Sequence, residues 1–245
     1  VAVYRCPMSN HLGRRETIPP PNEYKKTIKN IEKHLRLPRE DPHASGRPAR
    51  RLPPPCPREE VPNGHPCLKK IFVQGNEELL TQPEGGAALG ALLAKAEAVE
   101  ELDINTTGAM AASLQALAAK VPDALPCLKK IFLQGNEELL TQPEGGAALG
   151  AFLAKSEAVE ELNLIDTGAT AASLQALAAK VPDALQRVKK LSLFWNKESL
   201  KDSEGGAAVG SLLAKCEALE EFDFRYTQPT VASLQALAAK VPNAL

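Results

Sequence analysis

The chain has 245 residues, of which 44% are hydrophobic and 24% are charged, and both fractions are ordinary for a globular protein. Its formal net charge of −1 is unevenly divided, because residues 1–66 carry 13 Lys and Arg against 7 Asp and Glu, whereas residues 67–245 carry 16 against 23. No apolar run approaches the ~20 residues that a membrane-spanning helix needs, and the five scattered cysteines lack the pattern of a secreted disulfide framework. Composition therefore argues against both of those classes, and the charge division predicts two segments with different binding surfaces.

Residues 1–66 are predicted to form a basic, proline-rich arm. This segment holds 13 of the 20 prolines, so we expect no hydrophobic core of its own. One amphipathic helix is predicted at about residues 22–37, and the side chains expected to contact a partner along one side of it are Tyr24, Ile28, Ile31 and Leu35. Lysines occupy its other sides, so contact with RNA or lipid is a second interpretation, and packing on the acidic body is a third.

Residues 67–245 contain three copies of one sequence. Residues 67–126 and 127–186 are identical at 51 of 60 positions, and residues 187–245 follow the same plan more loosely. Each copy divides into two units with apolar residues at the first, fourth and sixth positions and Asn or Thr at the ninth. The six sets are Leu68, Ile71, Val73 and Asn76; Val99, Leu102, Ile104 and Thr107; Leu128, Ile131, Leu133 and Asn136; Val159, Leu162, Leu164 and Thr167; Val188, Leu191, Leu193 and Asn196; Leu219, Phe222, Phe224 and Thr227. This spacing predicts a short strand with one buried face in every unit.

A helix is predicted after each strand. Thr81 and Glu84 have the spacing of a capping box at a helix start, and residues 141–144 repeat it. The third copy lacks this Thr, so Asp202 or Ser203 is expected to cap its helix instead. A strand–helix unit of this kind cannot bury its apolar face alone, and the units are therefore expected to stack.

The six sets resemble the leucine-rich repeat, whose consensus is L-x-x-L-x-L-x-x-N. The long helical units and the two-unit alternation are most similar to the ribonuclease-inhibitor-like class. The resemblance covers residues 67–245 and departs from the consensus where Thr replaces Asn in every second unit, although both side chains can hydrogen-bond loop backbone. It implies an α/β solenoid of six strand–helix units, with a parallel concave sheet and convex helices, after an extended N-terminal arm. The family binds many unrelated proteins, so the resemblance implies protein binding without identifying a partner.

Charged pairs alternate at the second and third positions of the units. They are Lys69-Lys70, Glu100-Glu101, Lys129-Lys130, Glu160-Glu161, Lys189-Lys190 and Glu220-Glu221. Because neighbouring parallel strands lie ~4.8 Å apart, each Lys pair is expected beside Glu pairs. We interpret this charge ladder as structural, since a face that binds polyanions would have remained basic.

Aromatic side chains are predicted on the same exposed sheet face. We predict five partner-binding residues there: Phe72, Phe132, Phe194, the adjacent Trp195, and Arg225 in the last unit. Exposed aromatic and Arg side chains are typical anchors of protein interfaces. The alternative is that the rings pack on one another or on the arm.

The sequence offers little evidence for catalysis. Gly85, Gly86 and Gly90 faintly resemble a phosphate-binding loop, but they lack its Lys-Ser/Thr ending and recur in every copy, so they are expected to allow close helix packing. No nucleophile is paired with a base, and the Cys and His spacing matches no zinc motif. We therefore expect no enzymatic activity, no cofactor and no metal.

The first functional hypothesis is a non-catalytic scaffold subunit of a large assembly, with the solenoid as a rigid bracket and the arm as a tie. The alternatives are a free-standing recognition or inhibitor module that binds a protein in its concave face, and an RNA-contacting subunit that acts through the basic arm. We expect an intracellular protein, and a basic arm that starts at Val1 rather than Met is compatible with transit-peptide removal in a chloroplast or mitochondrion. The last unit keeps apolar residues such as Phe222 and Phe224, so we expect another molecule or further chain to cover that end.

Overall fold

The computed structural model describes residues 68–96, 98–122, 125–181 and 185–241, which belong to one compact unit. The predictions on the arm, including those on Tyr24, Ile28, Ile31 and Leu35, lie outside the described residues. No helix in the described part of the chain is long and apolar enough to cross a membrane.

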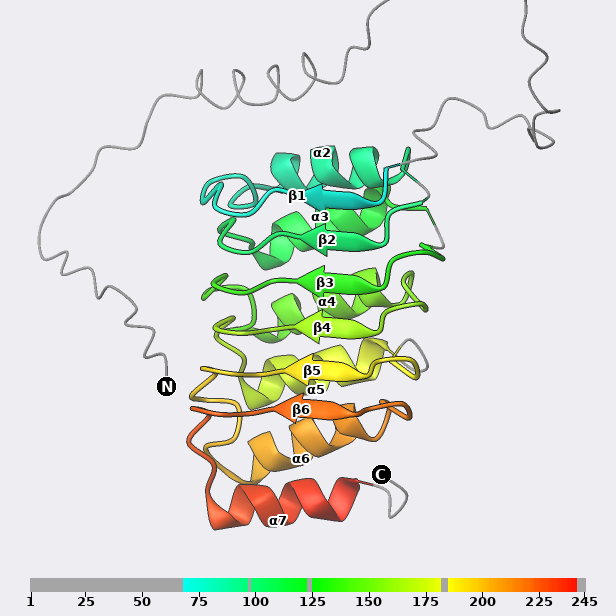
Figure 1. Ribbon diagram of the computed structural model, residues 1–245. Coiled ribbons are helices and arrows are strands. Elements are labelled where there is room, and N and C mark those ends of the chain that lie inside the picture. Colours follow the sequence, from blue (N-terminus) through cyan, green and yellow to red (C-terminus); the bar gives the residue numbers. More distant parts are fainter. Residues whose placement is uncertain (1–67, 97, 123–124, 182–184, 242–245) are drawn as a thin grey trace, which may run out of the picture. The chain divides into compact units, whose positions relative to one another are not determined.

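Strands and helices alternate strictly along the described chain (Figure 1). The strands are β1 (Lys70–Phe72), β2 (Glu101–Asp103), β3 (Lys130–Phe132), β4 (Glu161–Asn163), β5 (Lys190–Ser192) and β6 (Glu221–Asp223). The helices are α2 (Pro83–Leu93), α3 (Ala111–Lys120), α4 (Pro143–Leu153), α5 (Ala171–Lys180), α6 (Ser203–Leu213) and α7 (Val231–Lys240). Each strand pairs in parallel with the next one in sequence order, and the helices cover one side of the six-stranded sheet. The predicted α/β repeat solenoid is therefore confirmed, with one strand in each of the six units.

The core lies between the sheet and the helices. Side chains at the fourth and sixth strand positions, such as Leu102 and Ile104, are fully buried against helical leucines such as Leu114 and Leu117. The strands are only three residues long, so most of the apolar area comes from helices and from the stacking of units.

The ninth-position side chains join one unit to the next. The Asn136 side-chain oxygen accepts hydrogen bonds from the backbone N–H groups of Thr107 at 3.1 Å and Ala109 at 2.9 Å, and its amide donates to the Ile104 carbonyl at 3.0 Å. Asn196 makes the same contacts to the unit before it. The Thr107 and Thr167 hydroxyls donate to carbonyls of their own loops, at Ile104 and Leu164. Both Asn and Thr thus bond loop backbone, as the sequence predicted, and among these contacts only those of Asn reach the preceding unit.

The predicted capping box at the start of α2 is wrong. The Thr81 hydroxyl donates to the Glu78 carbonyl, and the N-cap residue is Gln82, whose side chain makes no capping bond. Pro83 follows directly; it has no N–H to satisfy and its fixed φ already suits the first helical turn. In the third copy Asp202 caps α6, as predicted, by accepting a first-turn N–H at 2.8 Å.

Glycine allows the two helices of each copy to pack closely. A Cβ at Gly86, Gly146 or Gly206 would overlap the backbone carbonyl of the following helix at Ser113, Ser173 or Ser233 respectively. This confirms that these glycines serve helix packing, as the sequence predicted.

Candidate functional site

The charge ladder forms two rows across the exposed sheet face. In the first row Lys69 and Lys129 both pair with Glu100, at 2.9 and 3.1 Å, and Lys189 pairs with Glu160 at 3.0 Å. The second row consists of the pairs Lys70–Glu101 at 2.8 Å, Lys130–Glu161 at 2.9 Å and Lys190–Glu221 at 2.9 Å. Lysines 129 and 130 therefore lie beside glutamates of both neighbouring strands, as predicted.

These ion pairs shift the pKa values of their members. Hydrogen bonds from Lys69 and Lys129 lower the pKa of Glu100, and the hydrogen bond to Glu100 raises the pKa of Lys69. The pairs are solvent-exposed, so each contributes little to stability. Their main effect is to leave this part of the face without a strong net charge.

An aromatic cluster lies beyond the ladder, in the loops that follow β5 and β6. It consists of Phe194, Trp195 and Tyr226, whose ring centroids are separated by 5.3 to 5.7 Å. Trp195 is 44% exposed and Tyr226 is 64% exposed.

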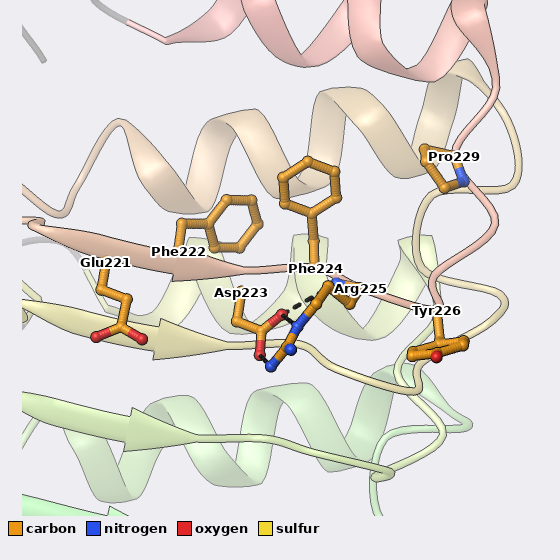
Figure 2. A pocket seen from close by; sticks show the side chains of 7 residues that line it. All are labelled: Glu221, Phe222, Asp223, Phe224, Arg225, Tyr226 and Pro229. Carbon is orange, nitrogen blue, oxygen red and sulfur yellow. Dashed lines mark hydrogen bonds and ion pairs between the residues drawn. The ribbon is translucent and has the colours of Figure 1, made fainter. Parts of the chain in front are cut away.

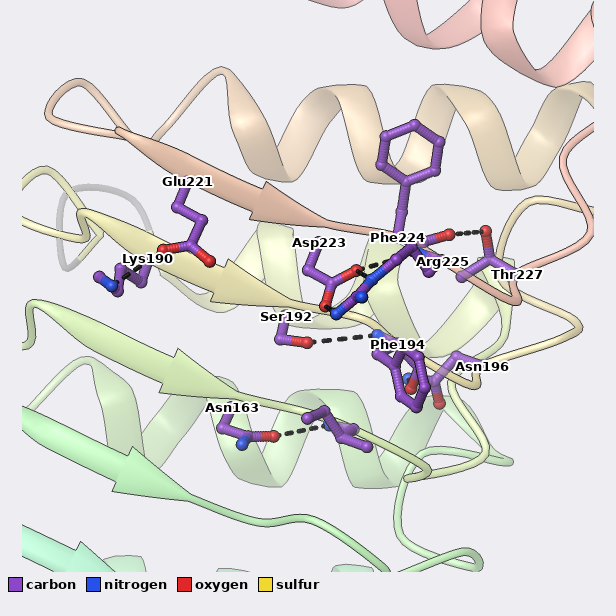
Figure 3. A network of polar contacts seen from close by, with 11 residues as sticks. Asn163, Lys190, Ser192, Phe194, Asn196, Glu221, Asp223, Phe224, Arg225 and Thr227 are labelled. Carbon is purple, nitrogen blue, oxygen red and sulfur yellow. Dashed lines mark hydrogen bonds and ion pairs between the residues drawn. The ribbon is translucent and has the colours of Figure 1, made fainter. Parts of the chain in front are cut away.

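Two cations accompany the aromatic cluster. The Arg225 guanidinium lies 5.2 Å from the centre of the Phe194 ring, and the Lys197 ammonium lies 5.4 Å from that of Trp195. Arg225 is held in place by Asp223, to which it donates from Nε at 2.9 Å and from Nη2 at 2.7 Å (Figure 3). This contact lowers the pKa of Asp223, so the carboxylate stays charged and fixes the guanidinium beside the ring.

Trp195 has a backbone conformation that is unfavourable for tryptophan. Its φ is +67°, and the equivalent positions of the first two copies are occupied by Gly75 and Gly135 at φ +75° and +72°. The left-handed region costs an L-residue other than glycine roughly 1–2 kcal/mol. Gln228, at φ +51°, similarly replaces Gly168 of the second copy. The third copy therefore has large side chains at two positions where the second copy has glycine, one in the aromatic cluster and the other two residues after Tyr226.

A groove adjoins the aromatic cluster at the β6 end of the sheet (Figure 2). It has a volume of about 790 Å³, and its lining residues are Glu221, Phe222, Asp223, Phe224, Arg225, Tyr226 and Pro229. The rings of Phe222 and Phe224 are stacked at 5.1 Å, only partly buried, and directed away from β5.

The structure brings together three of the predicted site residues, Phe194, Trp195 and Arg225. Phe72 and Phe132 lie on β1 and β3 instead, and Phe72 is 55% exposed. The alternative expectation that rings pack on one another is confirmed for Phe194 and Trp195.

Sequence reasoning missed Tyr226 and Lys197. A comparison of the copies would have found them, because Thr106 and Asp166 occupy the position of Tyr226, and glutamates occupy that of Lys197. Departures of the third copy from the first two therefore mark the site.

The fold and the site define the class of the protein as an α/β repeat solenoid with a charge-paired sheet face and an aromatic, cationic cluster at one end of it. No protein-family model matches the chain, and a search of curated proteins found no similar one.

Proposed function

We propose that the protein is a non-catalytic, protein-binding solenoid of the leucine-rich-repeat type, which serves as a scaffold subunit, and that the aromatic cluster with Arg225 and Lys197 is its main contact with a partner. The left-handed backbone of Trp195 is the observation that carries this proposal. Glycine occupies the same place in two otherwise similar copies, so the loop itself does not need a side chain there. Strained residues that a fold does not require are concentrated at functional sites.

The chemistry of the cluster favours a protein partner with acidic and aromatic groups. Its half-exposed rings provide rigid apolar contact area, and Trp, Tyr and Arg are the residues that most often dominate the energy of protein interfaces. Lys197 adds positive charge beside those rings, whereas Arg225 is paired with Asp223 and the neighbouring charge ladder is internally paired. The attraction for an acidic surface is therefore concentrated at the cluster.

A set of replacements drawn from the second copy tests this proposal. Phe194→Gln, Trp195→Gly and Tyr226→Asp together install the residues found at Gln134, Gly135 and Asp166, which already fit an equivalent loop. Wild-type and variant full-length chains would be immobilised, and the proteins that each retains from a lysate of the source cells would be quantified by mass spectrometry. We expect the triple variant to fold and to retain its specific partner at least about tenfold less.

Ser211→Ala is the matched control. It also installs a second-copy residue, Ala151, but on helix α6 rather than in the strand-end loops. This variant should retain the same partner as the wild type. Equal retention of all specific partners by the triple variant would disprove the role of the cluster.

A further inference from the structure

The β6–α7 end of the solenoid exposes side chains that are buried elsewhere in it. Helices α3 and α5 have identical sequences, and α7 differs from them only in its first residue. Leu114 and Leu174 are fully buried by the unit that follows them, whereas the equivalent Leu234 is 42% exposed. The same change affects Leu237, which is only partly buried. In the first two copies the equivalent surface packs against the start of the following copy. At the β6–α7 end the same surface is exposed.

The β1–α2 end is the counterpart of that surface. Asn136 is buried because it bonds the preceding unit, whereas the equivalent Asn76 is exposed. Ala88 is likewise exposed, although the equivalent Ala148 and Ala208 are buried. Since residues 67–126 and 127–186 are nearly identical, the surface that packs inside the chain at the start of the second copy is present at the start of the first.

The charges at the two ends are complementary. Inside the chain, successive copies are joined by Lys129–Glu100 and Lys189–Glu160. Lys69 precedes β1 at the corresponding place, and Glu220 precedes β6. Glu220 makes no ion pair with any residue that the structure describes. A strand that begins with a Lys pair would therefore extend the charge ladder if it lay beside β6.

Side-chain sizes at the two ends are complementary as well. At the internal junction, Leu102 of the first copy pairs with Ile131 of the second, and the residues just after the two strands, Ile104 and Leu133, are also fully buried. At the β6 end the equivalents of Leu102 and Ile104 are larger, Phe222 and Phe224. At the β1 end the corresponding residues are smaller, because Val73 replaces Leu133 and Leu92 replaces Phe152. A junction between the two ends would thus keep its total apolar volume near that of the internal one, as close packing requires.

One backbone contact would be lost in such a junction. Ala109 donates its N–H to Asn136, but Pro229 occupies the equivalent position and has no N–H. Asn76 would then keep its contacts to Thr227 and to the Phe224 carbonyl, the equivalent of Ile104, but lose one hydrogen bond, so this junction is expected to be weaker than the internal ones. Weakness of this kind is consistent with reversible association between separate chains.

We infer that the β6–α7 end of one molecule binds the β1–α2 end of a second copy of the same chain, with β6 and β1 paired in parallel in the register of β2 and β3. The contact surfaces differ, so each bound molecule leaves one further end free and the association gives linear chains. The inference concerns the ends of the sheet and holds whether or not the aromatic cluster is the partner-binding site.

Sedimentation velocity of the full-length chain over a wide concentration range tests the inference. The wild type should form dimers and longer species as concentration rises. Leu234→Glu and Ala88→Glu place a charge in one end each, and since both side chains are exposed in the free chain, both variants should fold. Each variant alone should associate at least about tenfold more weakly than the wild type.

Mixing the two variants gives the decisive result. Each retains one intact end, so an equimolar mixture should form dimers and nothing larger. Gln235→Glu is the matched control, because its equivalents Gln115 and Gln175 stay exposed within the solenoid, and it should associate like the wild type. Circular dichroism would confirm that every variant is folded.

A second pair of variants tests the charge contact. Glu220→Lys and Lys69→Glu should each weaken association, and mixing them should restore it in part. A wild-type chain that stays monomeric throughout, as it would if the arm covered one of the ends, would overturn the inference. Dimers formed equally well by either variant alone would also overturn it, because they would show a symmetric or unrelated interface.

Discussion

Trp195 combines a left-handed backbone with a half-exposed ring, and the two have opposite effects on the stability of its loop. Contact of its ring with Phe194 and Tyr226 stabilises the loop, whereas the backbone conformation destabilises it. Glutamate and lysine residues of the charge ladder show a related balance, since their ion pairs are well formed but exposed to solvent. Single residues on this face therefore change surface properties more than they change stability.

Trp195→Gly is expected to be more stable than Trp195→Ala. Both variants lose the ring contacts, but only glycine relieves the left-handed strain, which is worth roughly 1–2 kcal/mol. The relief is partly offset by the greater flexibility of glycine in the unfolded chain, so we expect a difference of about 1 kcal/mol. Urea unfolding followed by far-ultraviolet circular dichroism measures it. An alanine variant as stable as the glycine variant would show that the backbone at this residue is not strained.

Glu100→Gln is expected to change how stability depends on pH. The pKa of Glu100 is lowered in the folded protein by Lys69 and Lys129, so its contribution is fully present above the pKa of the unfolded chain and is lost as the pH falls through the folded value. The wild type should therefore lose more stability than Glu100→Gln between neutral and strongly acidic pH. High salt should reduce the difference, because the pairs are exposed. Unfolding midpoints measured across acidic pH at two salt concentrations provide the check.

At the scale of elements, each copy is a pair of helices packed through glycine. The Gly-Gly sequences at the starts of α2, α4 and α6 remove the Cβ atoms that would collide with preceding loops and with the following helix. Glycine in a helix costs stability, and its use here shows that close helix approach outweighs helix propensity. The glycines of the strand-end loops have a different role. Glycine is favoured there because the backbone has a positive φ.

Gly146→Ala should destabilise the protein much more than Gly75→Ala. A Cβ at Gly146 would overlap the Ser173 carbonyl, so α4 and α5 would have to separate, at an expected cost of about 3 kcal/mol. At Gly75 a Cβ would meet nothing within 4 Å, and only the left-handed backbone opposes it, at about 1 kcal/mol. Chemical denaturation of the two variants measures both costs. Equal costs would contradict the close packing of α4 on α5.

At the scale of the whole molecule, stability depends on the junctions between units. Strands pair only with their neighbours in sequence, and consecutive helices pack on one another. Asn136 and Asn196 add buried hydrogen bonds across the junctions between copies. The described solenoid therefore behaves as a one-dimensional array whose cooperativity is set by these junctions.

Asn136→Ala should both destabilise the protein and reduce its cooperativity. It leaves the buried N–H groups of Thr107 and Ala109 without their acceptor, at an expected cost of about 3 kcal/mol in total. The first copy should then unfold more independently, which lowers the denaturant dependence of unfolding. Asn76→Ala is the matched control, because Asn76 is exposed and, among the described residues, its side chain bonds only its own loop, at Val73 and Gln74, so its cost should stay below about 1 kcal/mol. Similar losses from both variants would contradict the role of Asn136 at the junction.

The fold could be predicted from the sequence because the same residue types recur at equivalent positions of several units. The buried strand residues, the charge ladder and the packing glycines each recur at fixed intervals, so their environments could be predicted. The aromatic cluster does not recur, and the approach of Tyr226 to Phe194 depends on how two loops turn after their strands. The caps of α2 and α4 were predicted wrongly because Thr81 bonds backward to Glu78, a local choice that spacing does not reveal.

The alternating charges also bear on how a newly made chain finds its register. Strand units within a copy have similar apolar patterns, so a strand displaced by one unit would still bury its side chains. Such a slip would place Lys69 and Lys70 beside Lys129 and Lys130, and like charges on adjacent strands repel each other. Displacement by a whole copy restores opposite charges and meets almost the same sequence again, which removes the discrimination. The alternating charges thus disfavour a register shift of one unit during synthesis but not a shift of one copy. Where several ribosomes translate the same message, we expect the main misfolded product to be nascent chains that have exchanged copies with one another.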